Sequence, residues 1–263
     1  MNGRFSSICS ISRLPDLEKR ALFASLIPPE LYSRFNLPKT LFDSEGRDLL
    51  CLVCPSGSSS VEMSLHHRCD FQDPLLYGHI TDTFTGQVHV LLFMLNDPSS
   101  PRFDVDRLPD GSPTQFGTAR RNLEAELAAM RYGLAPGQVR RGLRLLRGSI
   151  DAFEAFVASL GHDLYFAEPL HYHNAIIFER YGFSYEKGRK LVERIHAGFA
   201  PGGDLRKKLD GSTPFRMPEA ANSVRLRSWA IYDGILGEPF TSVTMYRRVG
   251  KPVTQQISAG CAW

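Results

Sequence analysis

The stretch from Leu134 to Tyr185 constrains the fold more than any other part of the sequence. It opens with a basic, glycine-containing segment, Pro136–Leu143, and continues as an amphipathic run to Leu160. A short apolar segment typical of a buried strand follows at Asp163–Ala167, and a second helical segment ends at Gly182-Phe183. Apolar spacing of this kind predicts helix, strand, helix and strand in that order, which is typical of an α/β fold.

Three or four strands are predicted before this stretch. Leu49–Cys54 and Val61–His67 are short apolar segments separated by a Gly/Ser-rich loop. Leu75–Leu95 is typical of a hairpin, with Thr85-Gly86 as its turn dipeptide. Successive hairpin-connected strands predict an antiparallel meander.

The hairpin also predicts a contact. If Thr85-Gly86 is a two-residue turn, Asp82 lies opposite His89, and the carboxylate would raise the pKa of the imidazole. The alternative is a simple polar cross-strand pair with no role in chemistry.

The other elements follow from helical spacing and from stop signals. Helices are predicted over Leu14–Phe35 with a break at Pro28-Pro29, from a Thr118 N-cap to Arg131 with Gly133 as C-cap, from near Pro136, and over Gly188–Phe199. Val224–Tyr232 and Ser242–Val249 alternate as strands.

Together these elements predict an α/β fold with a central mixed, mainly antiparallel sheet, one parallel strand pairing, and helices on both faces. We expect residues 1–200 to form the main domain, including the N-terminal helices. Residues 201–263 would form a strand-rich extension packed on the same domain.

Composition restricts the classes of partner. The chain has 263 residues, of which 43% are hydrophobic and 22% charged, with a net charge of +3. These values are typical of a globular protein and do not favour nucleic acid. The arginines and aromatics of Arg225–Tyr232 alternate, which favours an extended sheet or a subunit interface, so a homodimer is one expectation.

Location is predicted from what the sequence lacks. No apolar run approaches the roughly 18–20 residues that span a bilayer. Arg4, Arg13 and Asp16 interrupt any signal-peptide core, so a cytoplasmic protein without a membrane span is expected. An odd number of cysteines, five, favours a reducing compartment.

The segment Gln138–Gly142 is the first candidate binding site. A helix that begins here would present unpaired N–H groups and a partial positive charge to a phosphate. Arg140 and Arg141 add charge, and Gly142 permits close approach of the backbone. The alternative is an ordinary helix start with solvated arginines.

In this order of elements the chain resembles the GNAT superfamily of acyl-CoA N-acyltransferases. The resemblance covers roughly residues 49–187, and its specific parts are Gln138–Leu146 and Ala175–Phe183. The family's Leu-Tyr-Glu-Lys-Leu-Gly-Phe ending is similar to Ile177–Phe183 here. The resemblance implies an acyl-CoA donor, a small-molecule amine acceptor, and donor contacts from the residues Gln138, Val139, Arg140, Arg141, Gly142 and Asn174.

Three positions depart from the family pattern. Val139 stands at the Gln/Arg position, Arg144 at the second Gly/Ala position, and Phe178 where a tyrosine often protonates the leaving thiolate. Phenylalanine has no proton to give. These departures support an alternative, a catalytically degenerate GNAT-like protein that binds a ligand or a partner.

The segment Glu168–Asn174 follows a predicted buried strand, where ligand sites accumulate in α/β proteins. Glu168 or His173 is a candidate base for the amine, and Tyr172 a candidate acid for the thiolate. A metal-dependent enzyme that uses Glu168, His171 and His173 is a further alternative, although this short spacing does not favour a metal. Capping and surface roles are also open.

A second metal hypothesis concerns Cys51 and Cys54, whose spacing, with His66, His67 and Cys69 downstream, is compatible with zinc. In a strand, however, residues three apart face opposite sides. Buried cysteines are therefore the favoured interpretation.

Overall fold

The computed structural model describes residues 5–114, 120–251, 257 and 262–263, and the chain divides into two compact units. The first unit comprises Met1–Ser99, Gly142–Glu168 and Tyr246–Lys251. The second comprises Ser100–Arg141, Pro169–Met245 and Pro252–Trp263. The predicted division into residues 1–200 and 201–263 does not follow these units and stays a prediction.

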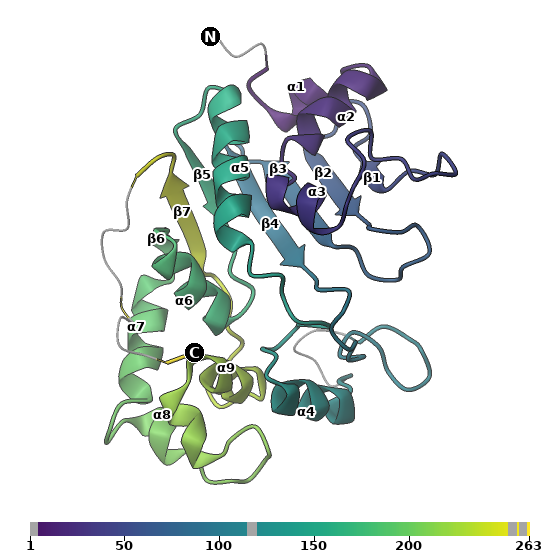
Figure 1. Cartoon of the computed structure of the whole chain (residues 1–263). Coiled ribbons are helices and arrows are strands. Elements are labelled where there is room, and N and C mark those ends of the chain that lie inside the picture. Colours follow the sequence, from purple (N-terminus) through teal and green to yellow (C-terminus); the bar gives the residue numbers. More distant parts are fainter. Residues whose placement is uncertain (1–4, 115–119, 252–256, 258–261) are drawn as a thin grey trace. The chain divides into compact units, whose positions relative to one another are not determined.

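The predicted fold class is confirmed, because the chain is α/β with a mixed sheet flanked by helices (Figure 1). The sheet has seven strands in the order β1-β2-β3-β4-β5-β7-β6. The strands of the first unit are β1 (Leu50–Val53), β2 (Ser60–Leu65), β3 (Leu76–Asp82), β4 (Val88–Leu95) and β5 (Leu164–Ala167). Strands β1 to β4 form the expected antiparallel meander, and β5 pairs with β4 in parallel.

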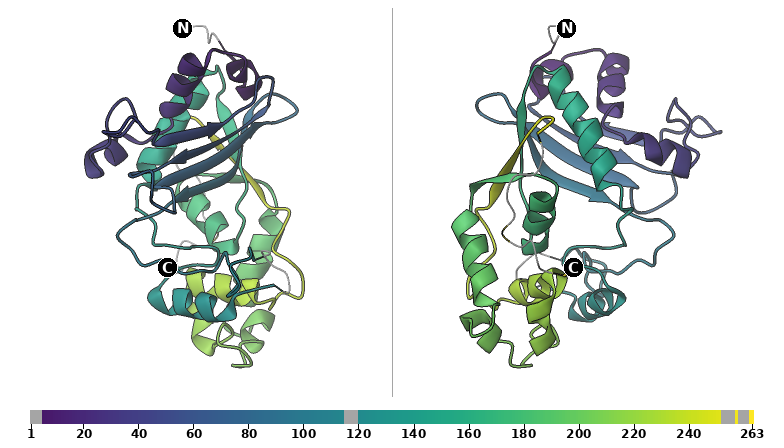
Figure 2. Two further views of the ribbon diagram at one scale, coloured as in Figure 1. Left: turned by 90° about the vertical axis from the view of Figure 1, so that its right-hand side faces the viewer. Right: turned by 60° about the vertical axis from the view of Figure 1, so that its left-hand side comes forward.

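The meander has an apolar face and a polar face, because side chains alternate along each strand. The apolar face is buried and includes Leu50, Met63, Leu76, Ile80 and Val88. Helices α1 (Ile8–Ser12), α2 (Asp16–Ala24) and α5 (Leu146–Ser159) lie on one side of these strands (Figure 2). On the apolar side, Phe153 of α5 lies 4.8 Å from Tyr165 of β5 between ring centroids.

The opposite side of the meander, called the polar face from here on, is only partly buried. The strand register places on it the following side chains, all partly exposed: Ser60, Glu62, Ser64, Tyr77, His79, Thr81 and His89. This contrast in burial and polarity sets the register firmly, since a slip of one residue would exchange the two faces.

The N-terminal helices agree with the predicted break at Pro28-Pro29. Helix α2 ends at Ala24, and the short helix α3 (Pro29–Arg34) begins at the second proline. The Arg34 guanidinium on α3 donates to the Leu143 carbonyl at 3.1 Å and lies 3.4 Å from the Asp97 carboxylate. Helix α3 is thereby tied to the segment that precedes α5.

The predicted Asp82–His89 pair is wrong. Asp82 pairs with Val88 and Thr81 with His89, because the turn spans Thr83–Gln87 and is longer than two residues. Asp82 instead accepts from the N–H groups of Ile8 and Cys9 at 2.8 and 2.9 Å, at the start of α1. That carboxylate therefore satisfies a helix N-terminus.

The helices of the second unit are α4 (Leu123–Tyr132), α6 (Tyr172–Arg180), α7 (Arg189–Gly198), α8 (Asp204–Lys207) and α9 (Val224–Tyr232), with a 3₁₀ helix at Pro218–Asn222. Asn122 caps α4 and Gly133 ends it with φ +101°, as predicted for the C-cap. The predicted N-cap, Thr118, lies outside the described residues. Strand β6 (Ser184–Lys187) belongs to this unit, and β7 (Thr244–Arg248) runs from it into the first.

Val224–Tyr232 is a helix, so the predicted strand there is wrong. The Ser223 hydroxyl accepts from the Leu226 N–H at 3.3 Å and caps the helix start. Trp229 anchors the helix in the core of the second unit, stacked 5.3 Å from Phe215, and its indole donates to the Leu134 carbonyl at 2.8 Å. Only β7 is a strand in the described part of residues 201–263, so that region is not strand-rich.

No helix in the described ranges combines the length and the apolar character that crossing a membrane requires.

Candidate functional site

The first notable feature of the first unit is the point where β4 and β5 part. Their parallel pairing covers His89 with Phe166 and Val90 with Ala167, after which the Glu168 N–H donates to the Val90 carbonyl at 3.0 Å. Strand β5 ends there, whereas β4 continues to Leu95. Beyond Val90, the residues of β4 therefore have no partner on β5 in the part of the chain that the structure describes.

A register irregularity lies at the same point. Val90 pairs with Ile80 and Leu92 with His79, so Leu91 is an extra residue on β4. Such a bulge turns the backbone locally and is common beside functional sites. Bulge and divergence therefore coincide within two residues of His89.

His89 and Glu168 come together at this divergence. The imidazole Nε2 lies 3.6 Å from the Glu168 Oε1, and the two side chains are 16% and 44% exposed. Among the described residues, Nε2 of His89 is a buried nitrogen with no hydrogen-bond partner. A buried polar atom of this kind is uncommon unless a ligand, a water or a reaction uses it.

Burial lowers the pKa of His89, and the Glu168 carboxylate opposes that shift only in part. The imidazole is therefore neutral at neutral pH, and its Nε2 can accept or pass on a proton. A neutral imidazole beside a solvent-accessible carboxylate is a pair suited to general base chemistry.

The polar face extends away from this pair across β3 and β2. The Tyr77 hydroxyl donates to the Glu62 carboxylate at 2.7 Å, and burial together with that carboxylate raises the pKa of Tyr77 to about 12. The Ser60 hydroxyl lies 2.9 Å from His79 Nε2. Polar groups thus continue from His89 to Glu62 on one side of the sheet.

The helix predicted to open at Gln138–Gly142 begins later, at Leu146, so that prediction is wrong. Gly137 and Arg144 have φ of +78° and +60°, which a right-handed helix does not allow. The segment between them is a loop, so its backbone N–H groups do not form a helix terminus.

Contacts within the second unit occupy the loop residues that were expected to bind the donor. Gln138 Oε1 accepts from the Ala135 N–H at 2.8 Å, and the Val139 carbonyl accepts from Phe103 at 2.8 Å. Arg140 donates to the Ser100 carbonyl, and the Arg141 guanidinium lies 4.7 Å from the Tyr132 ring. Binding of a donor by these residues stays a prediction.

The actual start of α5 lies in the first unit and is also basic. Arg144 and Arg147 are exposed on either side of its beginning. Gly148 allows the Glu30 side chain to approach, since a Cβ at this glycine would meet Glu30 Oε1 at 2.6 Å. The first turn of α5 therefore combines a positive helix end, two exposed arginines and one close carboxylate.

The predicted residues of α6 belong to the second unit and are mostly buried. Asn174 Oδ1 accepts from the His171 N–H at 3.1 Å as part of a helix cap. His173 is 2% exposed and its Nδ1 lies 2.9 Å from the Ser228 hydroxyl, while Tyr172 is fully buried. Burial lowers the pKa of His171 to about 4 and that of His173 well below its ordinary value. Catalysis by Tyr172 or His173 stays a prediction.

In the described part of the chain, no three His, Cys, Asp or Glu side chains are arranged to hold a metal ion. His171 and His173 are stacked, with ring centroids 5.5 Å apart. Cys54 is buried as expected, but Cys51 is exposed on β1. A metal-dependent enzyme that uses Glu168, His171 and His173 stays a hypothesis, as does zinc at the cysteines, of which Cys261 lies outside the described residues.

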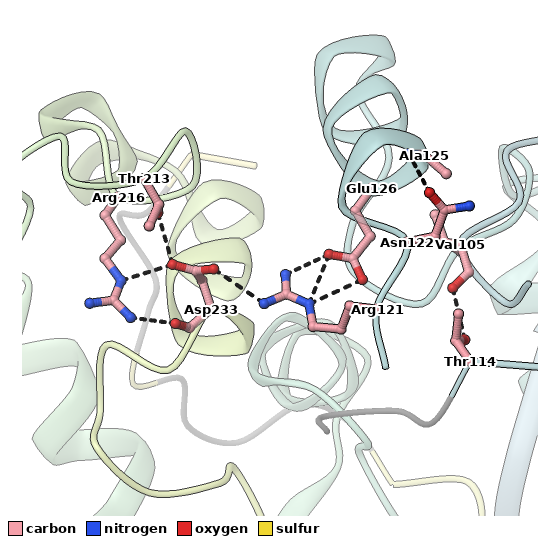
Figure 3. A network of polar contacts seen from close by, with 9 residues as sticks. All are labelled: Val105, Thr114, Arg121, Asn122, Ala125, Glu126, Thr213, Arg216 and Asp233. Carbon is pink, nitrogen blue, oxygen red and sulfur yellow. Dashed lines mark hydrogen bonds and ion pairs between the residues drawn. The ribbon is translucent and has the colours of Figure 1, made fainter. Parts of the chain in front are cut away.

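A charged network in the second unit was not predicted (Figure 3). Arg121 bridges two carboxylates, bonding to Glu126 and lying 3.2 Å from Asp233. Asp233 also accepts from Arg216 at 2.9 Å and Thr213 at 2.8 Å. Two arginines thus balance two carboxylates, which indicates a structural role.

Two features of the sequence could have indicated that charged residues gather here. They are the polar loop Asp210–Arg216 and the Asp233-Gly234 pair directly after α9. Neither signal indicates that Asp233 meets Arg121, because these two residues are 112 positions apart in the sequence.

Comparisons with protein-family models, with curated proteins and with solved structures each gave no match to this chain.

Proposed function

We propose that the chain is an N-acyltransferase that moves an acyl group from an acyl-CoA-like donor to an amine. The observation that carries the proposal is the His89–Glu168 pair at the divergence of β4 and β5. The order of motifs that resembles the GNAT superfamily and the parallel β4–β5 pairing beside the antiparallel meander of β1 to β4 support it further.

In the proposed reaction, Glu168 takes a proton from the protonated acceptor amine and passes it to Nε2 of His89, and the imidazolium that forms then releases a proton to water. The amine nitrogen then attacks the thioester carbon, a C–N bond forms, and the C–S bond breaks. The nitrogen loses its second proton to water as the amide forms. The coenzyme A thiolate takes its proton from water, because Phe178 cannot donate one.

Backbone groups supply the charge stabilisation in this proposal. The N–H groups of β4 just beyond Val90, where β5 has departed, would polarise the thioester carbonyl. The first turn of α5, with Arg144 and Arg147, would hold the donor's phosphates. Glu30 would move away from this turn on donor binding, because its carboxylate repels phosphate.

The test is donor binding followed by chemistry. Acetyl-CoA and a longer acyl-CoA are titrated into the protein by calorimetry, and free thiol release is then followed with and without added amines. Micromolar binding with amine-dependent thiol release supports the proposal. Absence of binding to every acyl-CoA contradicts it.

A second candidate is a GNAT-like protein without transfer chemistry that binds a ligand or a partner. Phe178 favours it, because this side chain stacks 5.0 Å from Phe183 and has no proton to donate. Tight acyl-CoA binding without thiol release under any amine would select this candidate over the enzyme.

A further inference from the structure

Two carboxylates on this side of the sheet lack a basic partner: Glu62 of the polar face, and Glu168, which lies beside His89. Glu62 accepts a hydrogen bond from Tyr77, and Glu168 faces the neutral His89. Among the described residues, no lysine or arginine forms an ion pair with either of them. Two carboxylates without a lysine or arginine partner among the described residues, Glu62 partly buried and Glu168 44% exposed, favour a cationic ligand here.

The two carboxylates lie at the same level of the sheet. Glu62 on β2 is opposite His79 on β3, and His79 is opposite Leu92 on β4. Phe166 is the partner of His89, and Glu168 comes two residues after Phe166. Glu168 is therefore level with the bulge at Leu91. Three strand spacings separate the Glu62 and Glu168 backbones, about 14 Å.

We propose that this face binds a linear diamine or polyamine as the acyl acceptor. One cationic end lies at Glu62 and the reacting nitrogen lies at His89 and Glu168. The inference rests on the proposed acyl transfer and adds the class of acceptor to it. His79 on β3 lies between the two ends, with its Nε2 2.9 Å from the Ser60 hydroxyl, and uncharged or hydrogen-bonding parts of the amine would pass there.

The test compares two amines that differ only in the second cationic group, 1,8-diaminooctane and octylamine, with acetyl-CoA as donor. The wild-type protein should show a kcat/KM about tenfold higher for the diamine, the size of one charged hydrogen bond. Glu62→Gln should remove this preference by raising KM for the diamine alone. The glutamine amide oxygen still accepts a hydrogen bond from Tyr77, so only the charge is lost.

Glu45→Gln is the matched control, since Glu45 is an exposed carboxylate of the first unit in a turn outside the polar face. It should leave both amines unaffected. Equal kcat/KM for the two amines in the wild type, or a preference that survives Glu62→Gln, overturns the inference while leaving acyl transfer intact.

If neither amine is acylated, the proposed reaction fails, and calorimetry with 1,8-diaminooctane alone still tests the face. Binding that Glu62→Gln weakens about tenfold, with a higher Kd at higher salt, supports a polyamine site. Absence of diamine binding overturns it.

Discussion

The Nε2 atom of His89 on β4 lies 3.6 Å from the carboxylate of Glu168, which directly follows β5, although the two residues are far apart in the sequence. The parallel pairing of β4 with β5 brings them together at the point where the two strands separate. Burial keeps the imidazole neutral while the carboxylate remains accessible. The first predictions concern this pair.

Glu168→Gln should lower kcat for acyl transfer by about 10²- to 10⁴-fold, the usual contribution of a general base. The Kd for acetyl-CoA should not change, because the substitution keeps size and shape. Steady-state thiol release and calorimetry measure the two quantities. A small loss in kcat would show that a group other than Glu168 takes the proton.

The same substitution should lower the pKa of His89 further. The Glu168 carboxylate favours the charged imidazolium, so removing its charge removes the one effect that opposes burial. A proton NMR titration of the His89 ring measures this shift. An unchanged or raised pKa would show that the two groups do not interact in solution.

The double substitution Arg144→Glu/Arg147→Glu should weaken acetyl-CoA binding at least about a hundredfold, since two charge-assisted contacts are reversed. Arg13→Glu/Lys39→Glu changes the same number of exposed charges in the first unit and serves as the control. Calorimetry gives both affinities. Equal effects of the two variants would indicate general electrostatics and contradict a donor site at α5.

Arg121→Ala should destabilise the protein by about 3–5 kcal/mol, because it leaves Glu126 and part of Asp233 buried without their cation. Arg189→Ala removes an exposed i,i+4 pair with Glu193 and should cost less than about 1 kcal/mol. Urea unfolding compares the two. A small loss for Arg121→Ala would show that the network in Figure 3 is not structural.

Stability should fall as the pH drops from the ordinary histidine value of 6.5 towards about 4. The pKa values of His171 and His173 are lower in the folded than in the unfolded chain. The unfolded chain therefore binds more protons between these pH values, and the stability that the two neutral histidines contribute is present above this range and lost below it. His171→Gln should flatten this dependence and leave the pH trend above 7 unchanged. An unaltered slope in denaturant unfolding would contradict neutral buried imidazoles.

Short apolar segments, alternation and the turn dipeptide Thr85-Gly86 were enough to predict the meander. Val61, Met63 and Leu65 alternate with polar residues, so the strand and its buried face follow from the sequence. The same signal misled at Val224–Tyr232, where charged and apolar residues also alternate. There the burial of Trp229 against Phe215 and the Ser223 cap favour a helix.

The site was predicted only in part. Glu168 was expected beside the end of a strand, but its partner His89 depends on which strand lies next to β5 and in which register. The start of α5 was predicted too early, because nothing in the residue type of Arg144 indicates its positive φ. Local sequence pattern therefore predicts most of the elements, whereas long-range strand pairing decides which side chains meet.

The most direct test of the account is the rate of thiol release from acetyl-CoA in the presence of an amine, measured for the wild type and for Glu168→Gln. The account predicts release that requires the amine in the wild type and nearly disappears in the variant, with unchanged acetyl-CoA affinity. Release that is independent of the amine, or equal in the two proteins, would contradict acyl transfer at the His89–Glu168 pair.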